Sequence, residues 1–217
     1  LFRSKSIYIC QNCGTNSPKW MGKCNNCGAW NSYVEELVEP KSKSAAVVNA
    51  PKSKPQLLHE ISSENRPRIL TSDTELNRVL GGGIVSGSLM LIGGEPGIGK
   101  STLLLQVVLQ TKGLKTLYVS GEESEQQLKM RADRIKQTNN DIFVYTETSV
   151  ESIVQQIDQV KPDLLVIDSI QTLETSLIES AGSVSQIREA THVLQQYAKR
   201  HHLPVFIVGH ITKEGTI

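Results

Sequence analysis

The sequence predicts an α/β fold in which a mostly parallel sheet, covered by helices, follows a small metal-binding module. Two observations lead to this expectation. Beyond about residue 66, short apolar runs alternate with segments whose apolar residues recur every three or four positions, as when strands alternate with amphipathic helices. Ahead of them, all four cysteines lie within a stretch of 18 residues. The chain is therefore expected to contain two parts of different kinds.

Composition excludes disordered and membrane-spanning proteins. The chain has 217 residues, of which 38% are hydrophobic and 21% charged, so it can bury a full-sized core. No apolar run approaches the roughly 20 residues of a transmembrane helix, and no secretory signal opens the sequence, so we expect a cytoplasmic protein without membrane contact. The net charge is +1, but residues 1–56 carry eight basic and three acidic residues, which permits contact with phosphate backbones.

The first module, residues 1–39, is expected to hold one structural zinc ion. Its candidate ligands form two Cys-x-x-Cys pairs, each followed by glycine: Cys10, Cys13, Cys24 and Cys27. Ten residues separate the pairs, enough for a hairpin that brings four thiolates to one tetrahedral ion. Four protein ligands leave no position for water, so the ion would fold the module and not catalyse. Two disulfides and a rubredoxin-like iron site are the alternatives; the lack of a secretory signal and of later cysteines disfavours disulfides.

Two tryptophans, Trp20 and Trp30, flank the zinc module's metal loops. Because such a small module needs apolar cover, we expect the two rings to pack over these loops. Stacking on nucleic-acid bases is the alternative role.

Residues 40–56 are predicted to be a flexible linker. The stretch is dominated by Lys, Ser, Ala and Pro, with no aromatic residue and no sustained periodicity. It cannot bury enough apolar surface to offset the entropy lost on ordering it. The zinc module is therefore expected to be tethered to a second domain, residues 57–217.

The second domain is predicted to alternate strands with helices. Strands are expected, in chain order, at residues 88–92, 116–119, 142–145, 164–167 and 204–208. Helices are expected at residues 102–109 and around the apolar stripes Leu128/Ala132/Ile135, Ile153/Ile157/Val160 and Ile187/Ala190/Leu194. Ser149 would start the third of these helices, and Ser183 with Gln186 would form a capping box for the fourth. Strands that are apolar throughout imply a parallel sheet covered on both faces.

A phosphate-binding loop joins the first of these strands to its helix. The pattern G-x-x-x-x-G-K-S is matched, and Thr102 follows it; the residues are Gly94, Glu95, Pro96, Gly97, Ile98, Gly99, Lys100 and Ser101. Glycines let backbone amides wrap a phosphate, and the helix N-terminus adds the positive end of its dipole. Lys100 is expected to reach the β- and γ-phosphates of ATP, and Ser101 to offer its hydroxyl to Mg²⁺.

Acidic residues are expected beside the triphosphate. Asp168 ends the strand at residues 164–167, the position of a Walker-B carboxylate that holds Mg²⁺ directly or through water; a loop or capping acid is the alternative. Glu122 and Glu123 follow the strand at residues 116–119, at the edge where ligands of open α/β sheets bind. Glu122 is preferred as general base because it is nearer the strand end, although both acids would also favour a helix start.

Together these features resemble the RadA family of bacterial DNA-repair ATPases, which are RecA-like motor proteins. The resemblance covers nearly the whole chain. It includes the two Cys-x-x-Cys-Gly knuckles and residues 76–85, 94–102, 120–124, 164–168, 182–186 and 208–215. The joint occurrence of these motifs is far more specific than any one of them.

The resemblance implies roles that the residues alone do not show. It makes Glu122 the group that activates water and His210 a sensor of the γ-phosphate, where a loop histidine would otherwise be favoured. It places DNA-binding loops at residues 172–182 and from Ile211 onward. It implies a homo-oligomeric, hexameric ring on single-stranded DNA that promotes branch migration of recombination intermediates together with RecA. The family continues beyond the position of Ile217, so we expect this chain to be a fragment.

Three functions are therefore compared. The first is a DNA-dependent ATPase motor for recombinational repair. The second is a nucleotide-gated module that binds DNA or protein without turnover, and the third is a RecA-like phosphotransferase. No lid or acceptor-binding segment is recognisable in the sequence, which disfavours the third.

Overall fold

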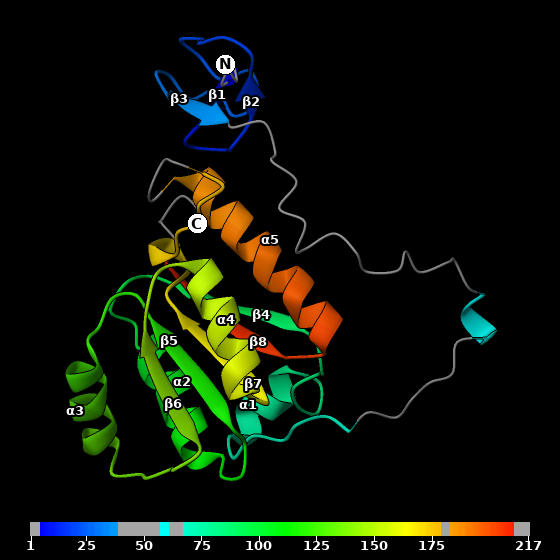
Figure 1. The fold of residues 1–217 in the computed structure, drawn as a ribbon, viewed down its shortest axis with the longest axis vertical. Helices are drawn as coiled ribbons and strands as arrows, with labels where there is room; N and C mark the ends of the chain where they lie inside the picture. The colour runs from blue at the N-terminus through cyan, green and yellow to red at the C-terminus, as the bar shows by residue number, and fades with distance from the viewer. Residues whose placement is uncertain (1–4, 39–56, 61–66, 179–182, 211–217) are drawn as a thin grey trace.

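The computed structural model describes residues 5–38, 57–60, 67–178 and 183–210. In this part of the chain, a three-stranded sheet of order β2-β1-β3 precedes a five-stranded sheet of order β4-β8-β7-β5-β6 (Figure 1). The predicted linker at residues 40–56 lies outside the described residues.

The first sheet forms a small ribbon that carries the cysteines. Its strands are β1 (Lys5–Cys10), β2 (Asn16–Ser17) and β3 (Tyr33–Val38), and both pairings are antiparallel. Cys10 ends β1 and pairs with Tyr33 at the start of β3, so one cysteine and one aromatic side chain meet at the closed end of the ribbon.

The second sheet is parallel throughout, as predicted. Its strands are β4 (Leu89–Gly94), β5 (Thr116–Ser120), β6 (Ile142–Thr146), β7 (Leu164–Asp168) and β8 (Val205–His210). Each lies where the apolar runs predict a strand. Because all five run the same way, the segments that follow β4, β5, β7 and β8 gather at one edge.

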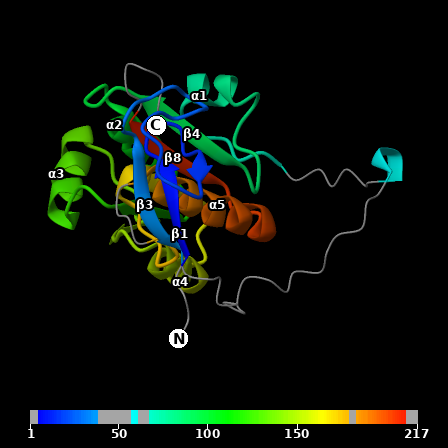
Figure 2. The same cartoon turned by 90° about the horizontal axis from the view of Figure 1, so that it is seen from above.

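Helices cover both faces of this sheet. The described helices are α1 (Thr74–Val79), α2 (Lys100–Gln110), α3 (Glu125–Ile135), α4 (Val150–Val160) and α5 (Val184–His201), with 3-10 turns η1 (Leu58–Glu60) and η2 (Ile170–Thr172). Figure 2 shows α1 and α2 on one side of β4 and β8 and α4 and α5 on the other. None of the described helices is long and apolar enough to cross a membrane.

The core is divided by the sheet into two apolar clusters. Along β5, Leu117 and Val119 pack toward α4 and α5, whereas Tyr118 packs toward α2 and α3. This alternation follows from the two-residue period of a strand, and full burial on both sides explains why residues 164–167 of β7 form a continuous apolar run.

Serine side chains start three of the helices. Ser149 accepts a hydrogen bond from the backbone of Ser152, which confirms the predicted start of α4. Ser183 likewise accepts from Gln186, but the predicted reciprocal bond is wrong, because the Gln186 side-chain oxygen is buried without a partner among the described residues. The complete capping box belongs to Ser124, at the start of α3.

Candidate nucleotide and metal sites

The four cysteines of the ribbon come together as one cluster. Their sulfur atoms all lie within 4.8 Å of one another, with Cys10 Sγ 3.6 Å from Cys27 Sγ and Cys13 Sγ 3.5 Å from Cys24 Sγ. None of the four forms a disulfide. Four thiolates at these separations fit a tetrahedral metal ion, which is the arrangement expected of a structural zinc site.

Hydrogen bonds to two of the four sulfurs, those of Cys13 and Cys24, favour the charged form that a metal requires. The Thr15 hydroxyl lies 3.2 Å from Cys13 Sγ and lowers the pKa of that thiol to about 5. A backbone hydrogen bond from Cys27, followed by one from the Tyr33 hydroxyl, lowers the pKa of Cys24. Because thiolates are the metal-binding species, these donors prepare the site for a cation.

The tryptophans of the ribbon do not cover the metal loops as predicted. Trp20 is 53% exposed and Trp30 is 71% exposed, with the Lys23 ammonium 5.5 Å from the Trp30 ring centre. The cover is supplied by Tyr33, which is 4% exposed and packs on the cysteines. The prediction was wrong because sequence position beside a knuckle does not reveal which ring faces inward.

The phosphate-binding loop lies between β4 and α2 at the carboxyl edge of the sheet. Gly97 and Gly99 have φ angles of +79° and +99°, and an added Cβ at either would enter open space. Glycine is thus required there for backbone conformation and not for room. Lys100, only 7% exposed, donates to the carbonyl oxygens of Gly94 and Glu95, each at 2.8 Å. Its ammonium is held over the loop that would receive the phosphates.

Ser101 and Asp168 meet directly, as the predicted magnesium site requires. The Ser101 hydroxyl donates to Asp168 Oδ1 at 2.8 Å. The hydroxyl proton is therefore directed at the carboxylate, which leaves the Ser101 oxygen lone pairs available to a cation. A hydroxyl and a carboxylate are oxygen ligands of the kind that Mg²⁺ prefers, so the residues present fit this ion. Thr102 follows on α2 and is exposed.

Glu122 lies between two partners at the same edge. The Ser169 hydroxyl donates to Glu122 Oε1, and His210 Nε2 lies 3.3 Å from that oxygen. The Glu122 side chain is 43% exposed, so water can reach it. His210 Nδ1 in turn lies 3.2 Å from the Lys100 ammonium. The histidine thus links Lys100 to the candidate base.

The neighbouring Glu123 is held in an ion pair away from Glu122 and His210. It forms an ion pair with Arg131 of α3, and the two side chains are 27% and 18% exposed, respectively. One oxygen of Glu123 and one nitrogen of Arg131 are buried with no other partner among the described residues. A carboxylate held by a cation in this way is a poor proton acceptor, which favours Glu122 over Glu123 as the base.

Three contacts of the site were not foreseen from the sequence: those of Ser169, Arg131 and Tyr118. Tyr118 donates its hydroxyl to Asp168 Oδ2 at 2.6 Å. Its signal in the sequence is a tyrosine between Leu117 and Val119 in a buried strand, because a buried phenol needs a hydrogen-bond partner.

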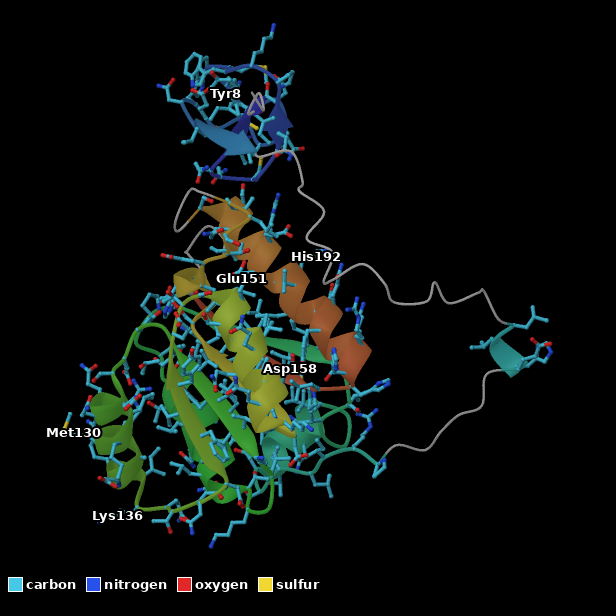
Figure 3. The ribbon with its side chains drawn as sticks, in the orientation of Figure 1. Tyr8, Met130, Lys136, Glu151, Asp158 and His192 are labelled. Carbon is cyan, nitrogen blue, oxygen red and sulfur yellow. The ribbon has the colours of Figure 1, made fainter. Side chains whose placement is uncertain are left out.

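Of the implied DNA loops, only residues 172–178 belong to the described part, and the loop from Ile211 onward lies outside it. The described piece is anchored by Glu151 at the start of α4, labelled in Figure 3. Glu151 Oε1 accepts hydrogen bonds from the Thr175 hydroxyl at 2.8 Å and the Ser176 backbone at 3.0 Å. The base of this loop is therefore fixed to the helix that follows β6.

A hollow of about 280 Å³ lies at the other edge of the sheet, away from the phosphate-binding loop. It is lined at the ends of α4 and α5, where Tyr197 donates to Asp158 Oδ1 at 2.5 Å. Asp158 is labelled in Figure 3. No residue of the nucleotide site lines it, so it takes no part in holding the phosphates or the metal ion.

Comparison with known proteins supports both parts of the chain. The AAA domain family matches residues 57–216, and a rubredoxin metal binding domain matches residues 8–35. A solved KaiC-like protein from Pyrococcus horikoshii OT3 aligns with a TM-score of 0.56 and 18% identity, over 70% of this chain and 74% of that one. This last likeness shows the fold alone.

Curated relatives match almost the whole chain. DNA repair protein RadA of Bacillus subtilis (strain 168) is 52% identical over 99% of this chain and 48% of that protein. The Listeria monocytogenes protein of the same name is 53% identical over 97% of this chain and 47% of that protein. The chain thus spans about half the length of these relatives. It belongs to the AAA domain family and is a homologue of DNA repair protein RadA, with a four-cysteine zinc ribbon ahead of its AAA domain.

Proposed function

We propose that this chain provides the ATP site and zinc ribbon of a DNA-dependent ATPase that acts in recombinational DNA repair. In this proposal the protein promotes branch migration of recombination intermediates on single-stranded DNA. The observation that carries it is the meeting of Lys100, the Ser101–Asp168 pair and Glu122 at one edge of the parallel sheet. A phosphate-binding lysine, a magnesium pair and a base are the parts that ATP hydrolysis needs.

Binding of ATP uses groups that are already in place. The triphosphate lies in the amides of the loop at residues 94–99, at the N-terminus of α2, where the helix dipole favours negative charge. Lys100 exchanges its bonds with the Gly94 and Glu95 carbonyls for phosphate oxygens, so little reorganisation is required. Ser101 and Asp168 would hold Mg²⁺, which would supply positive charge next to the phosphates.

Hydrolysis is assigned to Glu122 and His210. Glu122 accepts a proton from a water molecule as the water oxygen bonds to the γ-phosphorus. The bond between that phosphorus and the oxygen bridging to the β-phosphate breaks, leaving ADP and inorganic phosphate. His210, between Lys100 and Glu122, senses the γ-phosphate and keeps the base oriented.

The zinc ribbon and the partners follow from the same proposal. The ribbon holds Zn²⁺ through its four cysteines and takes no part in hydrolysis. The partners are single-stranded DNA, the RecA recombinase and further copies of the protein in a hexameric ring in the cytoplasm. Homology to DNA repair protein RadA supports this assignment.

ATP turnover of the full-length protein, with and without single-stranded DNA, tests the proposal. We expect stimulation by DNA, and a Lys100→Ala variant that has lost both nucleotide affinity and turnover. No stimulation together with no DNA affinity at low salt would contradict the proposal. DNA binding that needs ATP but no turnover would instead indicate the nucleotide-gated module, and phosphate recovered on an acceptor would indicate a phosphotransferase.

A further inference from the structure

Tyr118 is the one described side chain that reaches the far oxygen of the magnesium ligand Asp168. Its hydroxyl donates to Asp168 Oδ2 at 2.6 Å, while Ser101 occupies Oδ1 at 2.8 Å. Tyr118 is 0% exposed and Asp168 is 5% exposed. The carboxylate is therefore held at both oxygens inside the protein, and each oxygen keeps a lone pair for another ligand.

The sheet register makes this contact rigid. Tyr118 pairs with Val166 on the adjacent strand β7, and Ser120 pairs with Asp168. Asp168 is thus the diagonal neighbour of Tyr118 on the same face of the sheet, within reach of a long side chain. Both strands are fully buried within the sheet, so the backbone positions from which the two side chains extend are fixed relative to each other.

We propose that Tyr118 is a positioning residue that sets the orientation of the Asp168 carboxylate for magnesium. The torsion that rotates an aspartate carboxylate is broad, so one hydrogen bond to Ser101 does not define it. The second hydrogen bond, from the Tyr118 hydroxyl in the core, fixes the rotation of the carboxylate. Hydrogen-bond partners of metal-binding carboxylates act in this way on metal affinity. The inference rests on the proposed role of Asp168 as a magnesium ligand.

The surroundings of Tyr118 argue against a hydroxyl that is present only by chance. The ring packs in the same apolar cluster as Phe206 on β8, a position filled without any hydroxyl. An ionised carboxylate has no proton to give, so the Tyr118 phenol is the donor in its contact with Asp168. Its other acceptor among the described residues, the Ser101 carbonyl at 3.5 Å, is at the limit of a hydrogen bond.

A Tyr118→Phe variant tests the inference, because it removes the hydroxyl and keeps the ring. The measurement is the free Mg²⁺ concentration at which a non-hydrolysable ATP analogue reaches half of its full thermal stabilisation of the protein. We expect this midpoint to rise about 10-fold in Tyr118→Phe. Affinity for the analogue without Mg²⁺ should stay unchanged, since Lys100 and the loop amides are untouched.

Tyr145→Phe is the matched control. Tyr145 lies on the neighbouring strand β6, where its hydroxyl is 3.5 Å from a different carboxylate, that of Glu147. The Mg²⁺ midpoint of the Tyr145→Phe variant should equal that of the unchanged protein. A Tyr118→Phe protein that melts earlier but has the same Mg²⁺ midpoint would overturn the inference, because the hydroxyl would then serve stability alone.

A double-mutant cycle provides an independent check. In an Asp168→Asn background, Tyr118→Phe should have almost no further effect on the Mg²⁺ midpoint, because the carboxylate that it orients is gone. Equal effects in both backgrounds would contradict the inference. Neither measurement involves DNA or ATP turnover. Results that contradict the role of Tyr118 therefore leave the ATPase proposal standing. Conversely, a lack of DNA-stimulated turnover would not affect either measurement of Mg²⁺ binding.

Discussion

Two neighbouring glutamates, Glu122 and Glu123, show how much of the chemistry is decided by single contacts. Both follow β5 at the carboxyl edge of the sheet, and sequence position alone separates them only weakly. In the structure, Glu122 faces His210 and Ser169 and is open to water, whereas Glu123 is paired with Arg131. Which glutamate can act as a base is therefore a property of partners that the local sequence does not contain.

Replacing each glutamate by glutamine should separate their roles. Glu122→Gln is expected to lower ATP turnover about 100-fold or more while nucleotide binding persists, since the amide cannot accept the proton from water. Glu123→Gln should leave turnover within a few-fold and lower the free energy of unfolding by about 1 kcal/mol, because it weakens the partly buried bond to Arg131. Steady-state turnover and thermal unfolding of both variants check this.

The opposite ranking would contradict the assignment of the base. If Glu123→Gln abolished turnover and Glu122→Gln did not, the ion pair with Arg131 would have to open in the nucleotide-bound state. If neither variant changed a turnover that was already absent, while DNA binding still needed ATP, the nucleotide-gated module would be favoured.

Tyr118 also predicts a response to alkaline pH. Burial and the Asp168 charge raise its pKa well above the ordinary value of 10.0 in the folded protein. The unfolded chain therefore releases this proton at lower pH than the folded one. The contribution of Tyr118 to stability is full below pH 10 and is lost as the pH rises above it. Above pH 10, the stability of the unchanged protein should thus fall more steeply than that of Tyr118→Phe in denaturant titrations. If stability fell equally steeply with pH in both proteins, the raised pKa of Tyr118 would be contradicted.

Single residues also mark where prediction from the sequence stops. The phosphate-binding loop and Asp168 are predictable because a local pattern of residue types encodes their chemistry. The Tyr118 contact depends on the register of β5 against β7, and the Arg131 contact depends on where α3 lies. Neither the register nor the helix placement can be deduced from spacing along one chain.

At the scale of elements, the zinc ribbon has the smallest core in the described chain. Its buried apolar residues beyond the cysteines are few, chiefly Ile9 and Tyr33, whereas the AAA domain has two large clusters. We therefore expect the folding of the ribbon, but not that of the parallel sheet, to depend on a bound metal ion.

Zinc removal should therefore unfold the ribbon and leave the AAA domain folded. Chelation, or a Cys10→Ser substitution, is expected to disorder the ribbon and to leave ATP-induced thermal stabilisation of the AAA domain unchanged. Trp20 and Trp30 are the chain's two tryptophans and both lie in the ribbon, so tryptophan emission reports on this module alone. The control is Cys10→Ser treated with chelator, which should show no further change in emission. Loss of nucleotide binding on chelation would contradict the independence of the two parts.

Element positions were more predictable than their ends and surfaces. The five strands were found because buried parallel strands are apolar throughout, and the structure extends most of them by one or two residues. The six-residue helix α1 was not predicted, because a helix of fewer than two turns leaves almost no periodic signal. The exposure of Trp20 and Trp30 could not be predicted either, because the sequence around an aromatic residue does not show whether its ring covers a metal loop or faces solvent.

At the scale of the whole molecule, the ribbon and the ATP site lie at the same end of the sheet. Figure 1 shows the ribbon beyond the N-terminal end of α5, the end at which residues 172–178 also lie. Arg188 of α5 donates to the carbonyl oxygens of Cys13 and Gly14 in the first knuckle, at 2.7 and 3.1 Å. The first knuckle of the ribbon is thus joined to α5 near the end of the sheet at which the ATP site lies.

Binding of single-stranded DNA should accordingly depend steeply on salt. Each phosphate neutralised by lysine or arginine contributes about 0.7 to the slope of log affinity against log salt. We expect Lys23→Ala, beside Trp30 on the ribbon, to reduce that slope for oligo(dT), and Lys199→Ala, at the far end of α5, to leave it unchanged. Quenching of tryptophan emission by the oligonucleotide would report contact at the ribbon itself. An affinity that stays flat from low to high salt would rule out phosphate contacts. A steep slope without quenching would place those contacts on the AAA domain and leave the ribbon free for a protein partner.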